Sequence, residues 1–161
     1  MTGMRYMALI ALAGVAFAQA PAALTVTGDL PMPLKLTLAA LAAMPRQTAK
    51  VPNPKGGDYT YEGVSLLEVL KKAGAPNGSS LRGAALASYV LAKATDGYQV
   101  AFTLGEIDPS FGNTTVLVAD HRNGAPLSGD QGSLRLLVPG DHEGARSVRL
   151  LQSLEFVRLK K

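Results

Sequence analysis

Residues 132–140 have the sequence Gly-Ser-Leu-Arg-Leu-Leu-Val-Pro-Gly. The nearly continuous apolar run from Leu134 to Val138 predicts a strand. Pro139 and Gly140 favour turns, so we expect this strand to end there and a loop to follow. The run contains one charged residue, Arg135.

Further elements are predicted on both sides of this run. The apolar segment Val116–Ala119 predicts a strand, and the turn sequence Asn123-Gly124 follows it. On the C-terminal side, we expect a helical turn near Ser147–Leu151 and a last strand at Leu154–Val157.

The middle of the chain predicts a hairpin. Asp96-Gly97 is well suited to a tight two-residue turn and joins predicted strands at Ser88–Thr95 and Tyr98–Thr103. Thr103 and Glu106 then have the spacing of a capping box, which indicates that a helix begins at that point.

Two helices are predicted in the N-terminal half. Thr37 is a suitable N-cap for the apolar helix Leu38–Ala43. Ser65 and Glu68 form a second capping box, and Gly74 would supply the left-handed residue that ends this second helix.

The remaining predicted strands are Leu24–Gly28 and Gln47–Val51, with a turn at Pro31 and Pro33 and a hairpin loop at Pro52–Asp58. The total is about seven short strands with two or three short helices and no internal repeat. The fold class is therefore α+β, a β-rich mixed single domain.

The composition excludes several classes of protein. The chain has 161 residues, no cysteine and a formal net charge of +4. Without cysteine there can be no disulfide, cysteine-ligated zinc, iron–sulfur cluster or thiol nucleophile. The small charge, the low aromatic content of 6% and the absence of a basic run argue against nucleic-acid binding.

Residues 1–18 have the pattern of a Sec-type signal peptide. Arg5 precedes the apolar run Tyr6–Val15, and Ala16-Phe17-Ala18 fits a signal peptidase site. We therefore expect a domain of residues 19–161 that is periplasmic or secreted, without a stable membrane span after cleavage. The alternative is that the apolar run is retained as an anchor.

Arginines are concentrated in the last third of the chain, at Arg122, Arg135, Arg146, Arg149 and Arg158. A guanidinium group grips a carboxylate or phosphate through two parallel donors. These residues predict either an anion site or a solvated basic surface.

The two histidines, His121 and His142, each lie beside acidic residues. If the two segments met, they could form a metal site or an acid–base pair, but we expect surface loops. Aromatic residues at alternate strand positions are expected to stack in the core rather than line a pocket: Tyr59, Tyr61, Tyr89, Tyr98 and Phe102.

Five segments occur in a characteristic order: Tyr61–Leu70, Asp96–Tyr98, Asn123–Leu127, Gly132–Gly140 and Gly144–Arg149. In this order and spacing they resemble the molybdopterin-binding domain of the sulfite oxidase family of oxidoreductases. The resemblance extends over about residues 24–158. It implies the mixed α+β fold of that family, which holds a pterin-dithiolene molybdenum cofactor.

The resemblance also implies a set of cofactor-contacting positions. Arg135, Ser147, Val148 and Arg149 match positions that contact the cofactor in family enzymes. The arginines suit its anionic phosphate, and Arg146 would extend the same pocket.

Two acidic residues belong to the same set. Asp96 matches a recurring family residue, although the Asp-Gly hairpin alone would explain it. Asp130 stands where sulfite oxidases commonly carry a histidine.

The chain departs from the family at the metal ligand. The resemblance places the family's cysteine near Lys50 to Asn53, where this sequence has Lys-Val-Pro-Asn. Soft thiolate is what that coordination uses, and a protonated amine cannot replace it. A Sec-type signal also implies unfolded export, without a cofactor inserted beforehand.

We therefore expect a non-redox binding or accessory module, a pseudoenzyme with no catalytic or metal-ligating residue and no bound cofactor. Its partner would be a small anionic ligand or an envelope protein. The alternative is a molybdopterin-dependent oxidoreductase, or a subunit of one, that binds the cofactor without a protein thiolate. A third possibility is a purely structural partner-binding domain.

Overall fold

The computed structural model describes residues 23–159. The predicted signal peptide, residues 1–18, lies outside this range. The strands are β1 Leu24–Gly28, β2 Leu34–Leu36, β3 Arg46–Pro52, β4 Asp58–Ser65, β5 Ser88–Ala94, β6 Gln99–Thr103, β7 Leu117–Arg122, β8 Ala125–Pro126, β9 Arg135–Leu137 and β10 Leu151–Arg158. The helices are α1 Leu38–Ala42, α2 Leu66–Lys72 and α3 Leu104–Ile107, with 3-10 turns η1 Gly78–Ser80, η2 Gly83–Ala87, η3 Gly129–Gln131 and η4 Gly144–Arg146.

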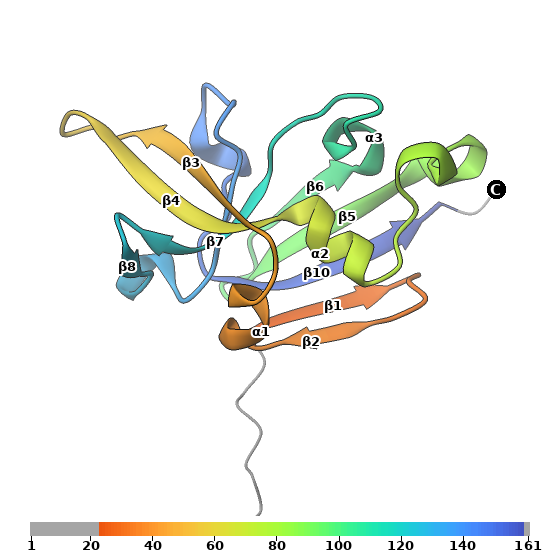
Figure 1. The fold of residues 1–161 in the computed structure, drawn as a ribbon, viewed down its shortest axis with the longest axis horizontal. Helices are drawn as coiled ribbons and strands as arrows, with labels where there is room; N and C mark the ends of the chain where they lie inside the picture. Colours follow the sequence, from red (N-terminus) through yellow and green to blue (C-terminus); the bar gives the residue numbers. More distant parts are fainter. Residues whose placement is uncertain (1–22, 160–161) are drawn as a thin grey trace, which may run out of the picture.

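These strands form two sheets, which occupy the right and left of Figure 1. The first has the order β2-β1-β10-β5-β6, and its one parallel pair joins β1 to β10. The second has the order β3-β4-β7-β8, with β9 paired to the N-terminal half of β7. The fold is the predicted β-rich α+β arrangement.

Strand β9 lies between two apolar clusters, which explains its apolar sequence. Leu136 belongs to the main core, together with α2 and the first sheet. Leu137 belongs to a smaller cluster with Tyr61, Leu117, Ala119 and Leu127. Side chains two apart on a strand share a face, so Arg135 lies on the side of the smaller cluster.

Several local predictions are confirmed. Thr103 and Glu106 form a reciprocal capping box at α3. Gly97, Gly124 and Gly74 have positive φ angles, as the predicted turns and the predicted helix stop require.

Three local predictions are wrong. Residues 147–151 form no helical turn, because Val148 exchanges two backbone hydrogen bonds with Leu136 and is held extended. Strand β2 follows the proline turn and pairs with β1, although no strand is predicted there. Glu68 pairs with Lys71 instead of completing a capping box with Ser65.

The predicted strand count is also too low, since ten strands are present in the described residues. The three additional strands are β2, β4 and β8. Strands β2 and β8 are short segments that are defined by pairing with a neighbour, whereas β4 is a full strand between β3 and β7. None of the helices in residues 23–159 has the length and apolarity to cross a membrane.

Candidate functional site

A pocket of about 380 Å³ opens beside β9. We call it the Arg135 pocket. It is lined by Asp96, Tyr98, Arg135, Gly144, Ala145, Ser147 and Arg149. The β5–β6 turn, strand β9 and the segment around η4 therefore bring together four of the seven predicted site residues, Asp96, Arg135, Ser147 and Arg149.

Arg135 is held in this pocket by neutral groups. Its Nη1 donates to the Tyr61 hydroxyl at 3.2 Å and to Gln131 Oε1 at 2.5 Å. Its guanidinium carbon lies 5.6 Å from the centre of the Tyr61 ring. Within residues 23–159 it forms no salt bridge, and its buried Nε has no hydrogen-bond partner.

The surroundings of Arg135 leave its positive charge uncompensated. Burial lowers the pKa of Arg135, and the charges of Arg149 and Arg122 act in the same direction. A half-buried cation without a carboxylate partner favours binding of an anion, because the anion supplies both charge and acceptors.

Arg149 reaches the same pocket but is paired with Asp130. Its Nη1 lies 3.1 Å from Asp130 Oδ2, and the two side chains are 58% and 73% exposed. The pKa of Asp130 is lowered, first by a hydrogen bond from the Gln131 side chain and also by Arg149. Asp130 therefore competes with any anion for Arg149.

The remaining predicted residues have mainly structural contacts. Ser147 Oγ accepts from the Val138 amide at 3.2 Å. Val148 is fully buried and contributes its backbone. Asp96 accepts from the Tyr98 amide at 3.0 Å, which stabilises the turn.

Tyr98 closes one side of the pocket. Its hydroxyl donates to the carbonyl of Ala145 at 2.5 Å and so links the β5–β6 hairpin to η4. Its side chain is 47% exposed, so the expectation that Tyr98 stacks in the core is wrong. Tyr61 and Phe102 are buried as expected.

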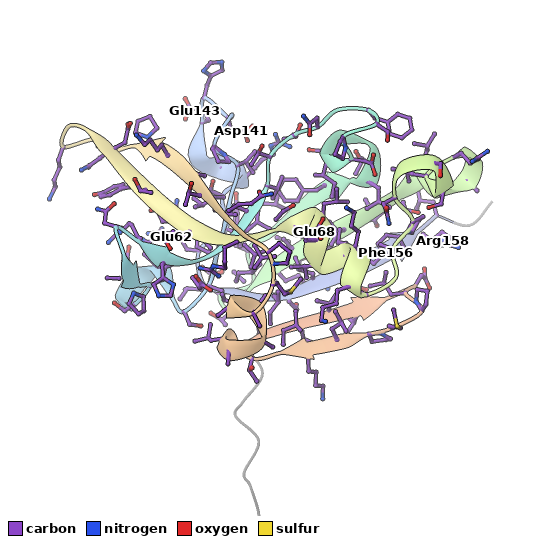
Figure 2. All side chains as sticks on the ribbon, viewed as in Figure 1. Glu62, Glu68, Asp141, Glu143, Phe156 and Arg158 are labelled. Atoms are coloured by element: carbon purple, nitrogen blue, oxygen red, sulfur yellow. The ribbon has the colours of Figure 1, made fainter. Side chains whose placement is uncertain are left out.

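Arg146 is not brought into the Arg135 pocket. Its Nη2 lies 2.7 Å from Asp141 and its Nη1 lies 2.7 Å from Glu106. It also lies over the Phe102 ring at 5.5 Å. The hydrogen bonds that Arg146 donates to Asp141 and Glu106 raise its pKa, so its charge is already compensated. Figure 2 labels Asp141 and Glu143 in the same projecting loop.

A second pocket, of about 690 Å³, is lined by other residues of the segment 139–147. We call it the Lys50 pocket. It is lined by Thr48, Ala49, Lys50, Gly112, Asn113, Thr114, Thr115, Pro139, Gly140, Asp141 and Arg146. The position that the resemblance assigns to the cysteine and the position that it assigns to the phosphate arginines therefore belong to two pockets.

The residues fit one part of the family's cofactor and not the other. The unpartnered Nε of Arg135 and the nearby Arg149 suit an anionic phosphate. No cysteine exists to ligate a metal, and the described residues contain no cluster of three or more His, Asp or Glu that could hold one.

The two histidines are not part of a shared site in the described residues. His142 is exposed in the loop after β9, as expected. His121 lies on strand β7 and contacts the buried Asp120, so the expectation of a surface loop is wrong for this residue.

Sequence reasoning missed Gln131 and the contact of Tyr61 with Arg135. The contact between Tyr61 and Arg135 depends on strand pairing, because β4, which carries Tyr61, and β9, which carries Arg135, both pair with β7. Gln131 lies four residues before Arg135 in the chain, a spacing that becomes informative once η3 is known.

Comparisons with known proteins agree with this architecture. Residues 11–161 match the family described as "Oxidoreductase molybdopterin binding domain". The crystal structure of the sulfane dehydrogenase SoxCD from Paracoccus pantotrophus is similar, with a TM-score of 0.61 and 22% identity. The match covers 83% of this chain and 37% of that chain, and at this identity it shows the fold alone. No curated protein matches the sequence significantly.

Proposed function

The chain belongs to the family of oxidoreductase molybdopterin-binding domains, and from this premise we propose that it is a non-redox module that binds a small anionic ligand in the Arg135 pocket. One observation carries the proposal. Arg135 is half-buried, has neutral hydrogen-bond partners and retains an unpaired donor. An anion with two or more oxygens would satisfy Arg135 and Arg149 together.

The donor set argues for binding without redox catalysis. The family's cofactor supplies redox chemistry at a metal that takes a protein thiolate, and this chain has no cysteine. Arg135, Arg149 and Ser147 would hold the phosphate end of such a cofactor. The protein would then be a pseudoenzyme that keeps the anion-binding part of its family's site.

A second candidate function is a molybdopterin-dependent oxidoreductase, or a subunit of one, that binds the cofactor without a protein thiolate. Membership of the family favours it. Elemental analysis of protein purified from its native host separates the two functions. About one molybdenum atom per chain, together with turnover of an oxyanion or a sulfoxide, would replace our proposal with this one.

Export is part of the proposal. The Sec-type pattern of residues 1–18 would deliver residues 19–161 to the periplasm or the medium, where a small anionic ligand or an envelope protein is the partner. Cell fractionation and N-terminal sequencing of the mature protein test this. A full-length protein in the cytosol would contradict it.

Binding is tested by isothermal titration with pyrophosphate. We expect Arg149→Ala to weaken binding by about tenfold and Arg135→Gln by about tenfold or more, because each removes a charge-assisted contact. Arg149 is exposed, so its replacement leaves the core intact. Arg82→Ala is the matched control, since Arg82 is exposed and bonded within its own turn.

The titration has a clear negative outcome. If pyrophosphate gives no saturable heat, or if Arg149→Ala and Arg82→Ala behave alike, the Arg135 pocket is not an anion site. The oxidoreductase and a partner-binding role would then remain, and a pull-down from envelope extract that neither replacement affects would favour partner binding.

A further inference from the structure

A third pocket, of about 270 Å³, lies between α1 and the end of β7. We call it the His121 pocket. It is lined by Leu38, Ala39, Ala42, Asp120, His121, Pro126, Leu127 and Ser133. It shares no lining residue with the Arg135 pocket, so an inference about it does not depend on the proposed function.

The polar end of this pocket is a fixed chain of three side chains. Arg46 of β3 donates two hydrogen bonds, of 2.6 and 2.8 Å, to the Asp120 carboxylate. The Asp120 Oδ1 atom also contacts His121 Nδ1 at 2.7 Å. Asp120 is 6% exposed, so its carboxylate is held in place by both neighbours.

A β-bulge makes the contact between Asp120 and His121 possible. The register between β4 and β7 shifts at this point, where Glu62 pairs with His121 and Gly63 with Ala119. Asp120 is therefore the extra residue. Adjacent residues of a regular strand point to opposite faces, and a bulge re-aims them.

The contact between Asp120 and His121 determines which imidazole nitrogen can form a hydrogen bond with a ligand. Although burial acts to raise it, the pKa of Asp120 lies below its usual value because Arg46 and His121 donate hydrogen bonds to the carboxylate. An ionised carboxylate only accepts hydrogen bonds, so His121 Nδ1 carries the proton. The atom that remains for a ligand is Nε2.

The other wall of the pocket is apolar and in contact with solvent. Leu38 is 44% exposed, an unusual position for a large apolar side chain. Ala39, Ala42 and Pro126 extend this apolar wall and are also exposed. A ligand with an apolar body would remove this surface from water.

We propose that the His121 pocket binds a small molecule with a ring-sized apolar body and one hydroxyl group, such as a monocyclic phenol, whose hydroxyl bonds to His121 Nε2. A hydroxyl suits this position because it can both donate and accept. The size is adequate, since a cavity of roughly 150 Å³ accommodates a benzene ring. Pockets of this kind combine an apolar lining with a few oriented polar groups.

The test is a titration of the full chain with phenol and with toluene, followed by NMR of the histidine ring nitrogens and of the backbone amides. We expect saturable phenol binding that shifts His121 Nε2 and the amides of α1. Toluene has a similar shape and no hydroxyl, so we expect it to bind about tenfold more weakly.

Three variants locate the contact. His121→Asn keeps a donor for Asp120 and removes the Nε2 position, so it should reduce phenol affinity to that of toluene. Ala42→Leu fills the exposed apolar wall without touching the core, and it should abolish binding of both probes. Arg149→Ala lies in the Arg135 pocket and should leave phenol binding unchanged.

Each contrary result overturns a defined part of the inference. No saturable phenol binding, or shifts confined to other parts of the protein, would eliminate the site. Equal affinities for phenol and toluene, or an unaffected His121→Asn variant, would eliminate the role of Nε2. None of these outcomes bears on pyrophosphate binding, so the two proposals succeed or fail separately.

Discussion

Replacement of Arg46 by methionine should destabilise the protein by about 1.5–3 kcal/mol at neutral pH. Arg46 donates two hydrogen bonds, of 2.6 and 2.8 Å, to the buried Asp120 carboxylate. Hydrogen bonds to charged groups contribute about 1.5–3 kcal/mol each. Arg46 is 31% exposed, so solvent screening reduces the sum of the two by roughly half.

The destabilisation should depend on pH with a defined sign. Against the effect of burial, the hydrogen bonds from Arg46 and His121 hold the pKa of Asp120 below its usual value. When the pKa of a carboxyl group is lower in the folded state than in the unfolded state, the group stabilises the fold at any pH above its unfolded-state pKa, which is about 4 for aspartate. This contribution is lost as the pH falls through the folded-state pKa. The difference between wild type and Arg46→Met should therefore be largest near pH 7 and shrink below about pH 4.

Urea denaturation followed by circular dichroism, at pH 7 and at pH 3, measures both effects. Lys71→Met is the control, because the ion pair of Lys71 with Glu68 is exposed and should contribute about 0.5 kcal/mol or less. If Arg46→Met costs no more than this control at pH 7, or if its effect is undiminished at pH 3, the electrostatic reasoning is wrong.

Three further predictions concern the second sheet and the two pockets beside it. Gly63→Ala should destabilise the protein by about 2 kcal/mol or more, because the added Cβ would lie 2.1 Å from a carbonyl oxygen of β7. Gly97→Ala should cost only about 1 kcal/mol, because Gly97 has φ +88° but open space around it, and thermal unfolding compares the two variants. Arg146→Met should lower stability by about 1 kcal/mol and speed proteolysis within 139–147, because it breaks two ion pairs of that segment; unchanged cleavage would count against this role. Asp130→Ala should tighten pyrophosphate binding about two- to fivefold by releasing Arg149, and weaker binding in a titration would contradict the competition between them.

Elements set by neighbouring residues could be predicted from the sequence. The hairpin at Asp96-Gly97 and the capping box of Thr103 and Glu106 depend on contacts within four residues, and both form, although Thr95 joins the turn, which is one residue longer than predicted. The apolar run Leu134–Val138 is also correct as a strand region, because burial between two clusters requires apolar side chains at successive positions.

Elements set by distant partners could not be predicted in the same way. Val148 is extended because it bonds to Leu136, twelve residues earlier, and not because of any preference of its own segment. Arg146 is drawn away from Arg135 by Glu106, forty residues earlier in the chain. The bulge that brings His121 to Asp120 depends on the register of β4 against β7, which no local pattern records.

The partners of the arginines bear on the proposed role of Arg135. Arg46 and Arg146 have carboxylate partners, whereas Arg135 has neutral ones. A half-buried cation without a carboxylate partner contributes little to stability, which supports the proposal that Arg135 binds an anion. The position that the resemblance assigns to the thiolate lies on β3 beside Lys50, in a different pocket from Arg135 on β9. Because different strands carry the two positions, substitution of a cysteine on β3 would leave the geometry of the Arg135 pocket unchanged.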